Sequence, residues 1–286
     1  MFQRMAAGLL LAKQSAKVLM SDKELILFPI LSSISCILVM ATFAVPLFLT
    51  GSYETLESQE GMTQAQQILG YVVAFLYYFV NFFVIVFFNS ALVSCAIIRL
   101  KGGDPTLSDG FSSALARLPQ IFAWALVAAT VGLLLKMLES RSGRGGNFIA
   151  SLLGMAWSIT TFFVVPVLVV ERLGPLAAIK RSGSIIRSTW GESLTARVGI
   201  GLLSFLAFIP FIGAIIGGVA LLTQSAAAGI TLIVVGALGV AIVGLLSSAI
   251  NTILLGGMYI YATEGQVPSQ FDSEAIQTAF AKKRTR

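Results

Sequence analysis

The sequence predicts an all-α, polytopic membrane protein with six transmembrane helices in three two-helix units, each preceded by a cytoplasmic amphipathic interfacial helix. Three observations predict this class. Apolar residues make up 57% of the 286 residues and charged residues only 11%, whereas a soluble domain carries about a quarter charged residues. Several stretches exceed the roughly 18 uncharged apolar residues that mark a spanning helix. Segments with basic residues and an apolar face alternate with these stretches.

We expect a single membrane domain covering residues 1–286. Its six spans lie at about residues 25–49, 68–98, 119–135, 148–170, 194–222 and 230–262. The second span is rich in aromatic residues. At about 1.5 Å per residue it is longer than a hydrocarbon core of roughly 30 Å, so it must tilt or project from the bilayer. Pro46 should kink or end the first span, because proline removes a backbone donor.

Four shorter segments read as interfacial helices, at about residues 2–20, 106–118, 176–190 and 271–283. The first has apolar residues at spacings of three and four, namely Phe2, Met5, Leu9, Ala12, Ala16 and Leu19. That pattern favours contact with lipid, and docking to a partner protein is the alternative. Asp272 is the expected N-cap of the last segment.

The basic residues indicate the orientation. Four lie at residues 4–23, three at 99–117, five at 172–197 and four at 282–286, so 16 of the 19 Lys and Arg residues fall on one side of the spans. The positive-inside rule therefore places both termini and the amphipathic connectors in the cytoplasm, and the expected location is a bacterial inner membrane.

The net charge of +6 is confined to short connectors, and five long stretches contain no charged residue. This distribution favours anionic lipid headgroups as the partner and argues against nucleic acid. The candidate headgroup contacts are Lys13, Lys17, Arg117, Lys180, Arg181 and Arg187.

We expect no enzymatic activity and no metal or cofactor. The chain has no histidine, and its two cysteines, Cys36 and Cys95, lie in apolar stretches. Phosphate-loop, dinucleotide-binding and nucleophile-elbow motifs are absent from the sequence. The Lys-Gly-Gly-Asp stretch at residues 101–104 superficially looks like an intramembrane aspartyl-protease motif, but no partner aspartate lies in a span. A pairing of Ser182 with Lys180 is left open, although serine beside lysine is common on a solvated face.

Uncharged polar residues recur in the even-numbered spans. They define a candidate polar junction of Asn81, Asn89, Thr161, Ser248 and Asn251. One interpretation is interhelical hydrogen bonding, which is worth about 0.6 kcal/mol per contact on average. The other is a polar cavity where these spans meet.

Small residues in the fifth span predict close helix packing. Gly213 and Gly217 form a GxxxG pattern, and Ala214 with Gly218 repeats the spacing. Because small residues let backbones approach closely, this face is expected to meet another helix, a second copy of the chain or a membrane partner.

Two stretches resemble a bacterial family of multi-pass membrane proteins of unknown function. They are residues 12–15 (AKQS) with 22–29 (DKELILFP), and residues 261–265 (YATEG) with Pro268, Phe271, Asp272, Ala279 and Phe280. More distantly, the chain resembles the membrane domain fused to some glycerophosphodiester phosphodiesterases. The resemblance implies a six-span bacterial membrane protein and brings no catalytic residues.

Together these observations favour a non-enzymatic membrane module that binds lipid or a partner protein. The alternative hypothesis is a channel or permease for a small neutral or lipid-like solute, which the polar residues of the spans suggest.

Overall fold

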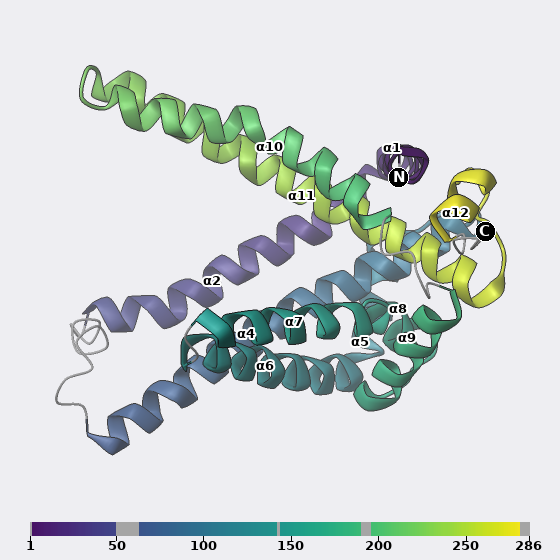
Figure 1. Ribbon diagram of the computed structural model, residues 1–286, viewed down its shortest axis with the longest axis horizontal. Coiled ribbons are helices and arrows are strands. Elements are labelled where there is room, and N and C mark those ends of the chain that lie inside the picture. Colours follow the sequence, from purple (N-terminus) through teal and green to yellow (C-terminus); the bar gives the residue numbers. More distant parts are fainter. Residues whose placement is uncertain (1, 50–62, 142–143, 190–195, 281–286) are drawn as a thin grey trace. The chain divides into compact units, whose positions relative to one another are not determined.

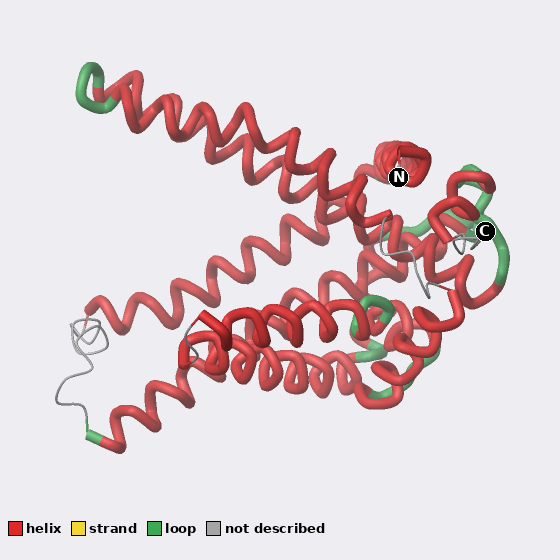
Figure 2. The backbone as a smooth tube through the Cα atoms, viewed as in Figure 1, coloured by secondary structure: helices red, strands yellow, loops and turns green. Residues whose placement is uncertain are grey.

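The computed structural model describes residues 2–49, 63–141, 144–189 and 196–280, and within these residues all regular structure is helical (Figures 1 and 2). The elements are α1 (Phe2–Ser21), the 3₁₀ helix η1 (Lys23–Ile26), α2 (Leu27–Leu49), α4 (Gln64–Leu100), α5 (Leu107–Leu115), α6 (Leu118–Arg141), α7 (Arg144–Thr160), α8 (Val164–Val170), α9 (Pro175–Thr189), α10 (Ala196–Leu221), α11 (Ala226–Glu264) and α12 (Ser273–Phe280). Five segments are long and apolar enough to cross a membrane, namely Lys23–Leu49, Gln64–Leu100, Leu118–Glu139, Phe148–Val170 and Ala226–Glu264.

The helices lie where the sequence predicts them, and several are longer than expected. α4 begins four residues before the predicted second span, and α6 runs beyond the predicted end of the third. Of α10, residues Phe205–Leu221 form an apolar helix, and it is shorter than the five segments above. The predicted fifth span, at residues 194–222, therefore stays a prediction. Residues 190, 194–195 and 281–283 of three predicted elements lie outside the described residues.

Contacts between residues divide the chain into two compact units. Unit 1 consists of Met1–Pro29, Cys95–Leu107 and Arg187–Arg286. Unit 2 consists of Ile30–Ser94 and Ser108–Ile186. Four helices, α2, α4, α5 and α9, contribute residues to both units, because the division falls inside them.

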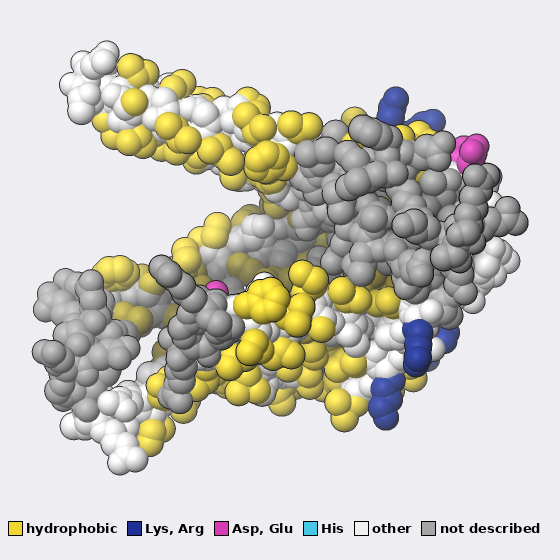
Figure 3. Space-filling view, viewed as in Figure 1, with side chains coloured by type: hydrophobic (Ala, Val, Ile, Leu, Met, Phe, Trp, Pro, Cys, Tyr) yellow, Lys and Arg dark blue, Asp and Glu magenta, His cyan; other side chains and the backbone are white. Residues whose placement is uncertain are grey.

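In unit 1, α10 and α11 form a helical hairpin whose backbones come close together at glycines. A Cβ atom on Gly218 would lie 2.8 Å from the carbonyl oxygen of Gly229, and one on Gly236 would lie 2.7 Å from that of Phe211. Close backbone approach allows the van der Waals packing that drives helix association in lipid. On the face that Figure 3 shows, many of the side chains along this hairpin are apolar.

The predicted GxxxG pair contributes little to this contact. Gly213 is exposed, and no described atom lies within 4 Å of a Cβ built on it. A Cβ on Gly217 would touch only the Leu232 side chain, at 3.5 Å. The close contact with α11 is made instead by Gly218, which belongs to the second predicted pair. Association of a further copy at Gly213 stays a prediction.

Helix α1 packs against α10, α11 and α12, and part of the apolar face predicted to contact lipid is buried against the protein instead. Leu11 and Ser15 are fully buried, although neither belongs to the predicted face. Of that face, Ala12 and Leu19 are buried, whereas Leu9 is 37% exposed. Because Leu9, Leu10 and Leu11 are consecutive, more than one face of the helix satisfies the same apolar spacing, and that spacing alone does not decide which face is buried.

Aromatic rings join the helices of unit 2. Phe79 and Phe83 of α4 lie against Phe122 of α6, with ring centroids 5.0 and 6.2 Å apart. Trp124 of α6 stacks on Trp157 of α7 at 5.7 Å. Such pairs add directional stabilisation to the burial of apolar area.

The fourth predicted span coincides with an apolar segment that is long enough to cross a membrane, Phe148–Val170, but it is not one continuous helix. The helix breaks between α7 and α8. Pro166 explains the break, because it has no N–H group and its ring clashes with the carbonyl four residues earlier. Across the break, the N–H groups of Phe162 and Val164 donate to carbonyls three residues earlier, at 3.2 and 3.1 Å.

Local hydrogen bonds define several helix ends. The predicted N-cap Asp272 is confirmed, because its carboxylate accepts from the Ala275 N–H at 2.8 Å. Thr63 and Gln66 form a reciprocal capping box before α4, which the sequence analysis missed. Pro46 was expected to kink or end the first span. α2 continues past it to Leu49, the predicted end of that span, and a kink at Pro46 stays a prediction.

Candidate functional site

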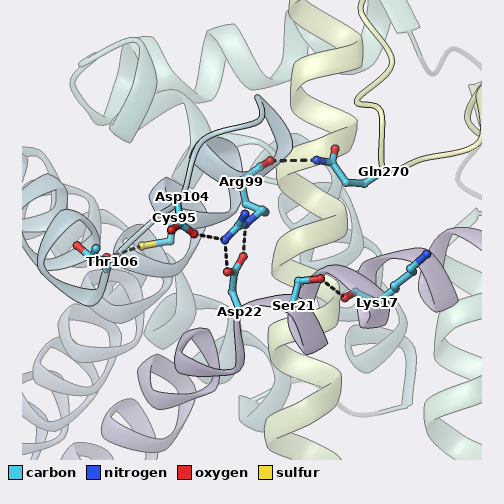
Figure 4. Close-up of polar contacts among 8 residues, drawn as sticks. All are labelled: Lys17, Ser21, Asp22, Cys95, Arg99, Asp104, Thr106 and Gln270. Carbon is cyan, nitrogen blue, oxygen red and sulfur yellow. Dashed lines mark hydrogen bonds and ion pairs between the residues drawn. The ribbon is translucent and has the colours of Figure 1, made fainter.

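A polar cluster in unit 1 is centred on Arg99, in the last turn of α4 (Figure 4). Its guanidinium donates to both carboxylate oxygens of Asp22, which precedes η1, and to the carboxylate of Asp104. The side chain of Asp22 is only 9% exposed, whereas that of Asp104 is 91% exposed. Bidentate pairing of guanidinium with carboxylate fixes orientation and contributes energy. Arg99 therefore joins the end of α4 to the junction between α1 and α2.

The turn after α4 returns Asp104 to Arg99. Gly102 has a φ of 89°, in the left-handed region that favours glycine. The Gly103 N–H donates to the Ile98 carbonyl at 2.9 Å, and a Cβ on Gly103 would lie 2.8 Å from the Ile98 side chain. The Lys-Gly-Gly-Asp stretch thus forms a tight turn that needs both glycines.

The C-terminal segment docks on the same cluster. The ammonium group of Lys101 lies 2.6 Å from the carboxylate of Glu264, and the amide of Gln270 donates to the Arg99 carbonyl at 3.1 Å. Farther along, the Phe271 ring lies directly over Gly257 of α11, where a Cβ would come within 2.2 Å of it. Arg99 and Lys101 both have opposite partners here. The cluster therefore links three segments that lie far apart in the sequence.

Five of the six predicted headgroup contacts are exposed, and four of these have no ion pair with a described residue. Lys13 and Lys17 lie on α1 in unit 1, while Lys180 and Arg187 lie on α9. None of the four forms an ion pair with any residue that the structure describes. Among the described residues, the positive charges of these four side chains therefore have no opposite partner.

The other two predicted contacts have partners within unit 2. Arg181 Nε lies 2.9 Å from both carboxylate oxygens of Glu171. Arg117 Nε donates to the Val169 carbonyl at 3.2 Å, near the end of α8. Burial and, to a smaller extent, the positive charge of Arg172 lower the pKa of Arg117, but a guanidinium keeps its charge in proteins. Arg117 and Arg181 thus form bonds within the protein, and their contact with headgroups stays a prediction.

The break in the fourth span is completed by α9. The Phe163 N–H, which loses its helical partner at the break, donates to the Ser182 hydroxyl oxygen at 3.0 Å. Ser182 is fully buried together with Ala178 on the same helix face. A buried backbone N–H needs such a partner. Lys180 is exposed, and residues two apart on a helix do not face each other, so the geometry does not favour a catalytic pair of Ser182 and Lys180.

The candidate polar junction draws its residues from both units. Asn81 and Thr161 donate to carbonyls four residues earlier in their own segments, at 2.9 and 2.8 Å. Asn89 is half-buried, while Ser248 and Asn251 are exposed. The hydrogen bonds of the first two therefore run along a helix. That all five residues meet stays a prediction.

A model of a family of unknown function (DUF6159) matches residues 68–269, which is more than two thirds of the chain. The chain belongs to the DUF6159 family. The sequence-based expectation of an uncharacterised family is thereby confirmed. No curated protein matches the sequence.

The DUF6159 match begins in α4 and ends after α11. It includes Arg99, Asp104 and all of α9, but not Lys13, Lys17 or Asp22. Of the two stretches that suggested the resemblance, residues 261–265 fall inside the match, and the N-terminal stretch lies outside it.

Sequence reasoning missed two structural roles in this DUF6159 protein. Arg99 was counted only as one of the positive charges beside a span. The available signal was a pair of aspartates in the two adjacent connectors, Asp22 and Asp104. The bond to Ser182 was also missed, although Pro166 within an apolar stretch indicates freed backbone groups that need partners.

Proposed function

We propose that this chain is a six-span integral membrane protein of a bacterial inner membrane and acts as a non-enzymatic module that binds lipid or a partner protein. Its ligand is an anionic lipid headgroup at the cytoplasmic face. Five long apolar segments and the shorter apolar helix in α10 support the membrane location. The distribution of Lys and Arg supports an orientation with both termini in the cytoplasm.

The exposed cations of α9 carry this proposal. The inner face of α9 is occupied, since Ala178, Ser182 and Ile185 are buried. Lys180 and Arg187 are exposed and have no ion-pair partner in the described parts of the chain. An unpaired cation beside apolar helices attracts anionic headgroups, at about 1 kcal/mol per charge near the surface.

The test is lipid retention by the purified protein, measured by native mass spectrometry after exchange into mixed phosphatidylcholine and phosphatidylglycerol. The double variant Lys180→Gln with Arg187→Gln should lose bound phosphatidylglycerol by more than roughly tenfold, since two such charges act together. Lys136→Gln is the control, because Lys136 is also exposed but belongs to the minority of basic residues on the other side. Equal retention by all three proteins would refute headgroup binding at α9.

The protein-binding form of the proposal has separate support. The more distant resemblance to the membrane domain of some glycerophosphodiester phosphodiesterases suggests a module that accompanies another domain. The exposed, open face at Gly213 offers room for a second copy or a membrane partner.

The second candidate function is a channel or permease for a small neutral or lipid-like solute. It is favoured by the exposure of Ser248 and Asn251 within an apolar helix, where polar residues often mark a pathway. Solute flux into proteoliposomes tests it. Asn251→Leu should abolish flux and leave the unfolding temperature unchanged if this residue lines a conduit, whereas absence of flux in the wild type would dismiss the candidate.

A further inference from the structure

Helix α1 is firmly attached to unit 1 by its inner face. Leu11 and Ser15 are fully buried, and α1 contacts α10, α11 and α12. The side-chain oxygen of Gln14 accepts from the Asp272 N–H at 3.1 Å. Asp272 in turn caps α12. The C-terminal helix thus helps to hold α1 in one orientation.

That orientation is crosswise to the hairpin of α10 and α11. In Figures 1 and 2, α1 is seen end-on while the hairpin runs across the view. α11 has 39 residues, which corresponds to about 58 Å and exceeds a hydrocarbon core of roughly 30 Å. If the hairpin crosses the bilayer, α1 lies parallel to the membrane plane, because it runs crosswise to the hairpin. It then lies at the end of the hairpin opposite the turn between α10 and α11.

The outer face of α1 combines apolar and basic side chains. Leu9, Leu10 and Met20 are 37%, 40% and 63% exposed. Lys13 and Lys17 are exposed between them and form no ion pair with described residues. The sequence of α1 contains no Asp or Glu, so this face has no negative charge of its own.

We propose that α1 is a membrane-surface helix whose outer face, formed by Leu9, Leu10, Lys13, Lys17 and Met20, lies in the headgroup layer of an anionic bilayer. This inference rests on the proposed membrane location. It names the surface of the protein that binds the negatively charged headgroups. The three apolar side chains enter the boundary between headgroups and acyl chains, and the lysines extend to the phosphates. Because α1 is already ordered by its inner face, lipid binding carries no cost of folding the helix.

The experiment places an environment-sensitive fluorophore on a cysteine at position 20 (Met20→Cys), in a background with Cys36→Ala and Cys95→Ala. The protein is studied in nanodiscs of phosphatidylcholine alone or mixed with phosphatidylglycerol. Position 224 (Gln224→Cys), exposed between α10 and α11, carries the same fluorophore as a water-exposed reference. The readouts are the emission wavelength and the rate of quenching by aqueous iodide.

We expect blue-shifted emission and protection from iodide at position 20, both stronger in phosphatidylglycerol. Replacing Lys13 and Lys17 together by Gln should weaken the response to phosphatidylglycerol by roughly tenfold. The reason is that each lysine near an anionic surface contributes about 1 kcal/mol to the binding of that surface. Both lysines are exposed, so the unfolding temperature of this variant should match the wild type and show that the fold is intact.

Equal quenching at positions 20 and 224 in every bilayer would overturn the inference. Protection produced by inorganic phosphate in pure phosphatidylcholine would instead identify a small-anion site, and protection that appears only with added cytosolic protein would identify a protein partner. Both outcomes contradict the proposal. The two proposals can fail separately. If the α9 variant loses bound lipid while position 20 on α1 stays exposed to water, the proposed lipid binding at α9 is supported and only the role of α1 is rejected.

Discussion

Arg99 illustrates how one charged residue at the end of a long apolar helix can contribute to the stability of the fold. It pairs with Asp22, whose side chain is nearly buried, while Lys101 pairs with Glu264 at a more exposed position. Removing one partner of a buried pair leaves an uncompensated charge, whereas an exposed pair contributes little.

Arg99→Met should therefore lower the free energy of unfolding by about 3 kcal/mol, measured by denaturant titration in detergent micelles. The control Lys101→Met should cost less than about 1 kcal/mol. Similar losses for the two variants would mean that water reaches Asp22 and that its ion pair is not a strong anchor.

Ser182 provides the second prediction at the level of single residues. Its hydroxyl oxygen is the partner of the Phe163 N–H at the break in the fourth span. Ser182→Ala leaves that buried N–H without an acceptor, which should cost about 1–3 kcal/mol. Ser184→Ala, at an exposed position of the same helix, removes an identical hydroxyl and should change stability by less than about 0.5 kcal/mol. Thermal unfolding of both variants decides whether the N–H needs this bond.

At the scale of elements, the hairpin of α10 and α11 depends on the absence of side chains at particular glycines. Gly218→Ala would place a methyl group 2.8 Å from a backbone oxygen of α11, and overpacking of this kind costs about 1–3 kcal/mol. Gly213→Ala meets no described atom within 4 Å and should stabilise the helix by up to about 1 kcal/mol through better helix propensity. A loss of stability at position 213 instead would reveal a contact with another copy of the chain.

The positions of the helices could be predicted from the sequence because charged residues and capping residues flank the apolar stretches. Asp272 is an example, since its N-cap role follows from local spacing alone. The buried face of α1 did not follow from the spacing of apolar residues, because the consecutive Leu9, Leu10 and Leu11 let that spacing fit more than one face. Leu11 rather than Leu9 packs inward only because α10, α11 and α12 lie on that side.

The Arg99 cluster escaped prediction for a different reason. Its partners, Asp22 and Asp104, are 77 and 5 residues away, and no local periodicity links a connector to the end of a distant helix. Likewise, Pro166 indicates that nearby backbone groups lack helical partners. The sequence does not indicate that the Ser182 hydroxyl oxygen accepts from one of them, the Phe163 N–H. Only the packed arrangement of helices brings such groups together.

At the scale of the whole molecule, orientation in the bilayer is the property on which both proposals depend. The cations that would bind lipid, on α1 and α9, belong to the 16 basic residues expected on the cytoplasmic side. The turn between α10 and α11 contains no charged residue and is expected on the opposite side. Translocating a charged connector is unfavourable, so the asymmetry of Lys and Arg determines which loops cross.

Single cysteines at Gln224 and Ser184, in a background without native cysteines, test this orientation in intact spheroplasts. Both positions are exposed, so accessibility does not bias the comparison, whereas Ser182 would be unsuitable because it is buried. A membrane-impermeant maleimide should label position 224 and leave position 184 unmodified until detergent opens the membrane. Because α9 carries Lys180, Arg181 and Arg187, labelling of position 184 from outside would place a basic segment in the periplasm. That result would reverse the topology and remove the anionic cytoplasmic leaflet as the partner of α1 and α9.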